Sequence, residues 1–370
     1  MKRKYGIFCL LVLFLVFCIG TPSLTAQAKV KSGTQVQAGR AGKFVKSKKK
    51  WRYRYKDGTY AKDSLLRIKG KIYYFSPKGY RMYGWQKIGK FMYYFGKNSE
   101  GFMYQNRWVS QNGKRTCYLK KNGHLSMPLS ADCAILVDAA TGEVIYSKNP
   151  DMRHGNGSTT KIMTCILALE KCKMWEKVTA SANAAAQVPT KLYLNAGETF
   201  RMKDMLYSLM VPSHNDTAVA IAEHIGGSEK AFVKMMNRKA AKLGCTNTHF
   251  ATASGLDMGL EHYTTARDLA KIAAYAWKSK TFRKIAGTTS YSMKSIQGKR
   301  YRFETSNELL NVLPGVKGMK TGYTRKAGNC FVGVVQAKSG KTYISVVLGS
   351  PTEDSRWDDS RALLTFAYNL

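Results

Sequence analysis

The chain is poor in acidic residues, in histidine and in long hydrophobic runs. It has 23 Asp and Glu against 60 Lys and Arg, a net charge of +37 over 370 residues. The 6 histidines are scattered and form no His-Glu-x-x-His motif, so we expect neither a metal nor a cofactor. The cysteines after residue 28 form no Cys-x-x-Cys pair, which argues against a disulfide framework. We expect Cys165 and Cys172, one heptad apart, to be small buried side chains.

The one long hydrophobic run predicts a signal peptide over residues 1–28. Basic MKRKY precedes GIFCLLVLFLVFCIG, and TPSLTAQA ends in an Ala-x-Ala pattern suited to cleavage after Ala28. A retained membrane anchor would need roughly 20 apolar residues, and no later segment is long and apolar enough. We therefore expect an exported, extracellular protein that is associated with the cell wall.

The positive charge is concentrated before residue 128. Residues 29–127 carry a net charge of +22 and residues 128–370 a net charge of +12. Outside the cell, the available polyanions are wall polymers and anionic lipid headgroups, so we expect no nucleic-acid partner. Residues 29–49 show no apolar period, which predicts a flexible basic linker.

Residues 50–127 contain a degenerate aromatic repeat. The segments KWRYRYKDG, GKIYYFSPKG, GKFMYYFGKNSEG and GKRTCYLKKNG each predict a strand closed by a glycine turn. They resemble the cell-wall-binding (choline- or glucan-binding) repeats of Gram-positive surface proteins, in which an aromatic cage holds choline. Because this copy is so basic, we expect an anionic wall polymer instead. Alternatively, Tyr73, Trp85, Tyr93 and Trp108 only pack the array.

Residues 128–370 have the pattern of a single larger domain. Helical periodicity appears at 158–172, 203–211, 216–225, 229–243 and 265–278, and a terminal helix at 360–370. Strand patterns occur before the first of these helices and again near residues 290–350. The order predicts an α+β domain in which helices cover a sheet.

Ser158 and Lys161 form a Ser-x-x-Lys motif at the head of an apolar helix. A serine and a lysine at this spacing lie on one face, and burial lowers the pKa of a lysine so that it can act as a base. Taken alone, the motif is better explained by Ser158 as a helix cap and Lys161 reaching to solvent. Ser47 and Lys50 have the same spacing within a lysine run.

Two further motifs follow in order. Ser213-His214-Asn215 lies in a loop between two helices, where Asp216 as a helix cap is the alternative explanation. Lys320-Thr321-Gly322 lies on a strand, and Gly322 leaves room for a substrate along that strand. Ser-x-x-Lys, Ser-x-Asn and Lys-Thr-Gly in this order mark penicillin-binding proteins and class A β-lactamases.

With STTKIMT, HYTTARDLAKIA and GMKTGYTRKAGNCFVGVV, these motifs make residues 130–370 resemble a serine-type D-Ala-D-Ala carboxypeptidase. This is the low-molecular-mass penicillin-binding protein family, peptidase family S11. The resemblance implies a penicillin-binding-protein/β-lactamase-like transpeptidase fold, an antiparallel sheet covered by helices, here preceded by the β-hairpin array. Asn156-Gly157 stands where the family has Pro-Ala, so we expect a looser approach to Ser158.

The resemblance also implies roles for individual residues. Ser158 attacks the peptide bond between two D-alanines of a peptidoglycan stem peptide, Lys161 takes its proton, and Ser213 relays a proton to the leaving amine. The family's substrate-binding positions correspond to Asn215, Lys320, Thr321, Gly322 and Tyr323. Arg356 either faces the substrate carboxylate or pairs with Asp354 or Asp358. β-Lactams are expected as covalent inhibitors.

Two other functions fit part of the pattern. A β-lactamase shares the three motifs, but the Glu-x-x-Leu-Asn loop that supplies the class A deacylation base is missing. A catalytically silent wall-binding protein would keep the repeats without turnover. A Ser–His–Asp hydrolase is disfavoured because Ser158 lacks the Gly-x-Ser-x-Gly elbow.

Overall fold

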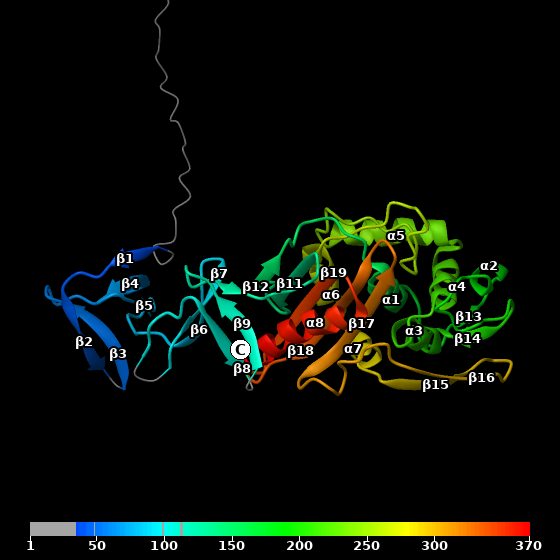
Figure 1. Cartoon of the computed structure of the whole chain (residues 1–370). Helices are drawn as coiled ribbons and strands as arrows, with labels where there is room; N and C mark the ends of the chain where they lie inside the picture. Colours follow the sequence, from blue (N-terminus) through cyan, green and yellow to red (C-terminus); the bar gives the residue numbers. More distant parts are fainter. Residues whose placement is uncertain (1–34, 48, 98–99, 112–113) are drawn as a thin grey trace, which may run out of the picture.

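A row of β-hairpins leads into a larger body of sheet and helices (Figure 1). This computed structural model describes residues 35–47, 49–97, 100–111 and 114–370. The predicted signal peptide, residues 1–28, lies outside the described residues. Within the described part of the chain, no helix has both the length and the hydropathy that a membrane span requires.

The N-terminal region is built from four antiparallel hairpins. They are β2 (Gly42–Ser47) with β3 (Lys50–Tyr55), β4 (Ser64–Ile68) with β5 (Lys71–Phe75), β6 (Gly84–Ile88) with β7 (Phe91–Phe95), and β8 (Arg107–Gln111) with β9 (Lys114–Leu119). Strand β1 (Val36–Ala38) runs parallel to β4, and β10 (Leu125–Ser126) pairs with β9. Lys69 and Gly70 both have positive φ, as a two-residue hairpin turn requires. Whether these hairpins are wall-binding repeats stays a prediction.

The structure corrects the predicted linker over residues 29–49. Strands β1 and β2 occupy residues 36–38 and 42–47. Phe44 is the reason, because its ring lies 5.2 Å from that of Tyr53 and 5.1 Å from that of Tyr73. The contacts of Phe44, together with the pairing of β1 with β4 and of β2 with β3, thus give a regular structure to a segment that has no apolar period of its own.

The larger body contains a five-stranded antiparallel sheet in the order β12-β11-β19-β18-β17. Its strands are β11 (Cys133–Asp138), β12 (Val144–Lys148), β17 (Val316–Thr324), β18 (Gly328–Gln336) and β19 (Thr342–Ser350). Alternate residues face two different cores: Ile135 packs into the helical core and Leu136 into the other. Short pairs β13 (Lys177–Thr179) with β14 (Thr199–Arg201), and β15 (Ser290–Lys294) with β16 (Arg300–Glu304), lie outside this sheet.

Helices cover both faces of the sheet. The elements are the 3₁₀-helix η2 (Gly157–Thr160), α1 (Lys161–Lys171), α2 (Ala182–Ala185), α3 (Met202–Met210), α4 (Asn215–Gly226), α5 (Glu229–Lys242), α6 (Ala266–Trp277), α7 (Lys280–Ala286) and α8 (Glu353–Tyr368). The predicted central helices agree with these bounds closely, except that residues 158–160 form η2. Helix α8 begins seven residues earlier than predicted, because Thr352 and Ser355 form a reciprocal cap that apolar periodicity does not reveal.

The hairpins and the larger body share a hydrophobic core. Trp85 packs edge-on against Phe366 of α8 with ring centroids 4.8 Å apart. Met92 of β7 and Leu119 of β9 belong to the same buried cluster as Trp357. Of the four aromatic residues singled out above, Tyr73 and Tyr93 are buried and Trp85 is a packing residue. Trp108 is 40% exposed and packs against Tyr118.

Candidate active site

Lys161 is buried beside Ser158 at the start of α1. Its side chain is 0% exposed, and its Nζ donates to Ser158 Oγ at 2.8 Å. The same ammonium donates to Asn215 Oδ1 at 2.7 Å and to the carbonyl of Ser254 at 2.8 Å. A lysine that reaches to solvent is therefore excluded. Nor is Ser158 a helix cap, because it lies inside η2, between a cap at Asn156 and the start of α1.

The surroundings of Lys161 disfavour its charged form. Burial lowers its pKa well below the usual range, and the positive charge of Lys320 lowers it further. The carboxylate of Asp216 opposes this effect. Ser158 Oγ thus lies within hydrogen-bond reach of an amine that releases its proton far more readily than a lysine in water.

Ser213 enters the site from the loop before α4. Its φ is +78°, a conformation that is strained for any residue with a side chain. Its Oγ is buried and has no hydrogen-bond partner among the described residues. His214 holds the loop, since its Nδ1 and the Ser208 hydroxyl lie 2.9 Å apart. Burial and the charges of Lys161 and Lys320 lower the pKa of His214 to about 3, so this imidazole is neutral.

Asn215 and Asp216 both form hydrogen bonds to other residues of the chain. Besides accepting from Lys161, Asn215 donates through Nδ2 to the carbonyl of Val188 at 3.1 Å. The predicted alternative of Asp216 as a helix cap is wrong. Its carboxylate instead accepts from the backbone N–H groups of Leu192 and Leu194 at 2.9 and 3.1 Å. These bonds fasten the loop before β14 to the start of α4.

Lys320 and Thr321 lie on strand β17, which packs against η2. Lys320 is buried, and its Nζ lies 3.3 Å from the carbonyl of Thr321. Burial first, and then the charge of Arg356, lowers the pKa of Lys320 to about 7. The hydroxyls of Thr321 and Ser306 lie 2.7 Å apart.

Gly322 allows strand β17 to lie close to the turn that carries Ser158, while its predicted role in leaving room for a substrate stays a prediction. A Cβ at this position would lie 2.5 Å from the carbonyl oxygen of Asn156 and 2.9 Å from the backbone nitrogen of Thr159. It would therefore collide with the turn that carries Ser158. A Cβ at Gly157, in turn, would lie 2.8 Å from the backbone nitrogen of Tyr323. The strand and the serine turn are thus in direct backbone contact, while the Tyr323 side chain is 61% exposed.

Arg356 is buried in the first turns of α8, and not on the surface. Its partner is Glu353, so pairing with Asp354 or Asp358 is wrong. The guanidinium also lies over the ring of Trp357, 4.3 Å from its centroid, and its Nε has no partner among the described residues. The charge of Arg356 contributes to the lowered pKa of Lys320, and a pair of cationic side chains that influence one another is suited to binding a carboxylate.

Hydrogen bonds hold the Asn156-Gly157 segment in place. The looser approach to Ser158 that we expected from these two residues is therefore not found. Asn156 is fully buried, and its Nδ2 donates to the hydroxyls of Thr159 and Thr160 at 3.1 and 2.9 Å. The Thr160 hydroxyl lies 2.8 Å from His262 Nε2. Sequence reasoning missed this network and the Ser254 carbonyl. The polar run Asn-Gly-Ser-Thr-Thr before a buried helix was the one available indication.

The comparisons place the fold and the family. The solved Streptomyces K15 DD-transpeptidase superposes with a TM-score of 0.62 at 32% identity, over 65% of this chain and 98% of that one. The fold is therefore that of the DD-peptidases. The family model for D-alanyl-D-alanine carboxypeptidase, peptidase S11, matches residues 120–352, and the chain belongs to this family.

Curated relatives agree. D-alanyl-D-alanine carboxypeptidase DacF of Bacillus subtilis is 37% identical over 269 residues, which is 71% of this chain but 66% of that protein. The chain thus spans just under two thirds of DacF. The D-alanyl-D-alanine carboxypeptidase of Streptomyces strain K15 is 36% identical over 62% of this chain and 84% of its own length.

The lowered pKa of Lys320 predicts a pH effect. If protonated Lys320 holds a substrate carboxylate, kcat/KM, which reports free enzyme, should fall as pH rises past about 7. Arg356→Gln removes the neighbouring charge, so this falling limb should move to higher pH while KM rises. The pH profile of D-alanine release checks both effects. Arg361→Gln, an exposed arginine on the same helix, should change neither, and an unmoved limb in Arg356→Gln would contradict the coupling.

Proposed function

We propose that this chain is a serine D-Ala-D-Ala carboxypeptidase that works through an acyl-enzyme on Ser158. The observation that carries the proposal is the 2.8 Å contact from the buried Lys161 amine to Ser158 Oγ. With Lys161 neutral, Ser158 Oγ attacks the carbonyl between the two D-alanines and its proton passes to Lys161. The C–N bond breaks as the proton passes from Lys161 through Ser213 to the leaving amine, and D-alanine departs. Water then cleaves the Ser158 ester and restores the hydroxyl.

Other groups hold the substrate and the developing charge. The backbone N–H groups of Ser158 and Tyr323 form the oxyanion hole, and Gly157 brings the two segments together. Lys320, Thr321 and Arg356 bind the terminal carboxylate, which gives specificity for the C-terminal end of a peptide. The side-chain amide of Asn215 donates one N–H to the carbonyl of Val188, and its second N–H orients the substrate backbone.

The experiment that tests the proposal is incubation with a peptide ending in D-Ala-D-Ala and, separately, with penicillin. Release of D-alanine together with a slowly released penicillin adduct is expected. Rapid turnover of penicillin would favour the β-lactamase alternative. No D-alanine and no adduct would favour the silent wall-binding protein.

We also propose that the chain is exported and that the hairpins bind an anionic wall polymer. A groove of about 750 Å³ between hairpin β6–β7 and strand β12 is lined by Lys87, Lys90 and Lys120. Lys87 pairs with Glu143 at 2.7 Å. Burial and the charges of Lys120 and Lys90 lower the pKa of His124. Glu143 is the one acidic residue among those that line the groove, so the groove keeps a net positive charge. With Tyr73, Tyr93 and Trp85 used in packing, an anion fits this region better than choline.

Neutralising the groove should weaken polymer binding. Lys90→Gln combined with Lys120→Gln is expected to lower the affinity for a purified anionic wall polymer several-fold and to reduce its salt dependence. Co-sedimentation across a salt series measures both. Lys62→Gln with Lys78→Gln removes the same charge from exposed positions outside the groove and is the matched control. Equal losses of affinity in the two double variants would show that polymer binding depends on net charge alone, and would contradict the groove as the binding site.

A further inference from the structure

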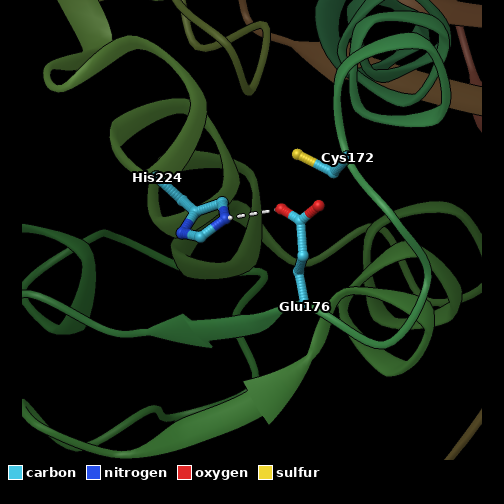
Figure 2. A group of neighbouring side chains, drawn as sticks. All are labelled: Cys172, Glu176 and His224. Atoms are coloured by element: carbon cyan, nitrogen blue, oxygen red, sulfur yellow. Dashed lines mark hydrogen bonds and ion pairs between the residues drawn. The ribbon is translucent and has the colours of Figure 1, made fainter.

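A second convergence of side chains lies at the opposite end of α1 from Ser158 (Figure 2). Cys172 caps the end of α1, Glu176 follows in the next turn, and His224 lies in the last turn of α4. One ligand atom from each, a sulfur, a carboxylate oxygen and a ring nitrogen, lie within 4.8 Å of one another. No other set of three such side chains converges in this way in the described part of the chain. The structure also corrects Cys172 from a fully buried to a partly buried residue.

The donor set suits zinc. Thiolate, imidazole and carboxylate are its protein ligands, with bonds of about 2.0–2.3 Å, so ligand atoms around a tetrahedral ion lie about 3.3–3.8 Å apart. His224 Nε2 and Glu176 Oε2 are already 3.5 Å apart. The Cys172 sulfur lies within 4.8 Å of both atoms, so binding requires this side chain to move closer by up to roughly 1 Å. The side chains of His224 and Glu176 are 28% and 36% exposed, which leaves an entry path and room for water as a fourth ligand.

The carboxylate is oriented before any ion arrives. Glu176 Oε1 accepts from the backbone N–H of Lys173 at 2.7 Å, which leaves Oε2 directed toward His224. The Glu176 carbonyl accepts from the N–H of Met202 at 2.7 Å, which fastens this turn to the start of α3. Such outer hydrogen bonds are what hold metal ligands in position.

The electrostatics of the helices favour a cation at this end. Helices α1 and α4 both direct their C-terminal ends toward the cluster, and each end carries about half a negative charge. Their N-terminal ends carry Lys161 and Asn215. Lys171, Lys173 and Lys177 flank the cluster in sequence, but all three are exposed and water screens their charge.

We propose that Cys172, Glu176 and His224 bind one Zn²⁺, with water as the fourth ligand. On binding, the Cys172 thiol releases its proton to solvent, and sulfur, Glu176 Oε2 and His224 Nε2 bond to the ion. Thiolate and carboxylate neutralise its two positive charges. The ion ties together α1, α3 and α4, roughly 17 Å along α1 from Lys161 at 1.5 Å per residue. This site departs from the expectation of no metal and is independent of the proposed reaction.

The test is titration of the purified, chelator-treated protein with Zn²⁺ by calorimetry, and with Co²⁺ by absorption spectroscopy. One Zn²⁺ per chain and a thiolate-to-Co²⁺ charge-transfer band are expected. Zinc at about 100 times its Kd should raise Tm by up to about 5–10 °C. Cys172→Ser, Glu176→Gln and His224→Gln should each weaken binding by at least about 10–100-fold.

Controls keep the test decisive. His249→Gln alters an exposed histidine outside the cluster and should leave zinc binding unchanged. A cooperative thermal unfolding transition of each ligand variant without zinc shows that it is folded. Penicillin labelling, measured separately, then distinguishes failure of this site from failure of the proposed reaction. Unchanged zinc affinity in the three ligand variants, or a Co²⁺ spectrum without the thiolate band, would overturn the proposal.

Discussion

Ser158→Ala is expected to lower D-alanine release by at least about 10⁴-fold and to abolish the covalent penicillin adduct. Removing the nucleophile of a serine hydrolase leaves only the contribution of substrate binding and of the oxyanion hole. Stability should change by about 1 kcal/mol, because Lys161 loses one hydrogen bond and keeps those to Asn215 and Ser254. A steady-state assay with a D-Ala-D-Ala peptide, together with thermal unfolding, measures both effects.

The sequence provides a matched control for this variant. Ser47 stands three residues before Lys50, the same spacing as Ser158 and Lys161, but on hairpin β2–β3. Ser47→Ala should therefore retain full activity. If Ser158→Ala kept more than about one hundredth of the D-alanine release, the nucleophile would have to be another residue.

Lys161→Met is expected to slow acylation by about 10²–10⁴-fold, the usual contribution of a positioned base. Methionine fills the volume of the buried side chain, so the loss reports the missing amine rather than a cavity. Burial lowers the pKa of Lys161, so the wild type should gain activity with rising pH on a limb well below 10.5. The variant should lack this rising limb. Stopped-flow acylation by penicillin across pH measures it.

Lys171→Met is the control, since Lys171 lies in the last turn of the same helix and is exposed. It should acylate at the wild-type rate. An unchanged pH profile in Lys161→Met would mean that another group accepts the Ser158 proton.

Much of the candidate site could be predicted from the sequence, because its residues lie in three short motifs. The helix that places Lys161, the loop that carries Ser213 and the strand that carries Lys320 all follow from local patterns. The Ser254 carbonyl could not be predicted, because a backbone acceptor leaves no trace in residue type. The partner of Arg356 and the contact between Trp85 and Phe366 depend on packing between segments far apart in the chain.

Two other differences also have physical reasons. The basic segment at 36–47 lacks an apolar period, yet Phe44 orders it by packing on other hairpins. Cys172 had the heptad spacing of a core residue, but α1 ends at Lys171 and the thiol turns toward Glu176 and His224. A period measured within a helix says nothing about the residue that terminates it.

The most direct test of the reaction is to locate the acyl group. The wild-type protein is incubated with penicillin, digested and analysed by tandem mass spectrometry. We expect one adduct, on Ser158, which forms at the same rate at which penicillin inhibits D-alanine release. An adduct on any other residue, or inhibition without an adduct, would contradict the assignment of Ser158 as the nucleophile.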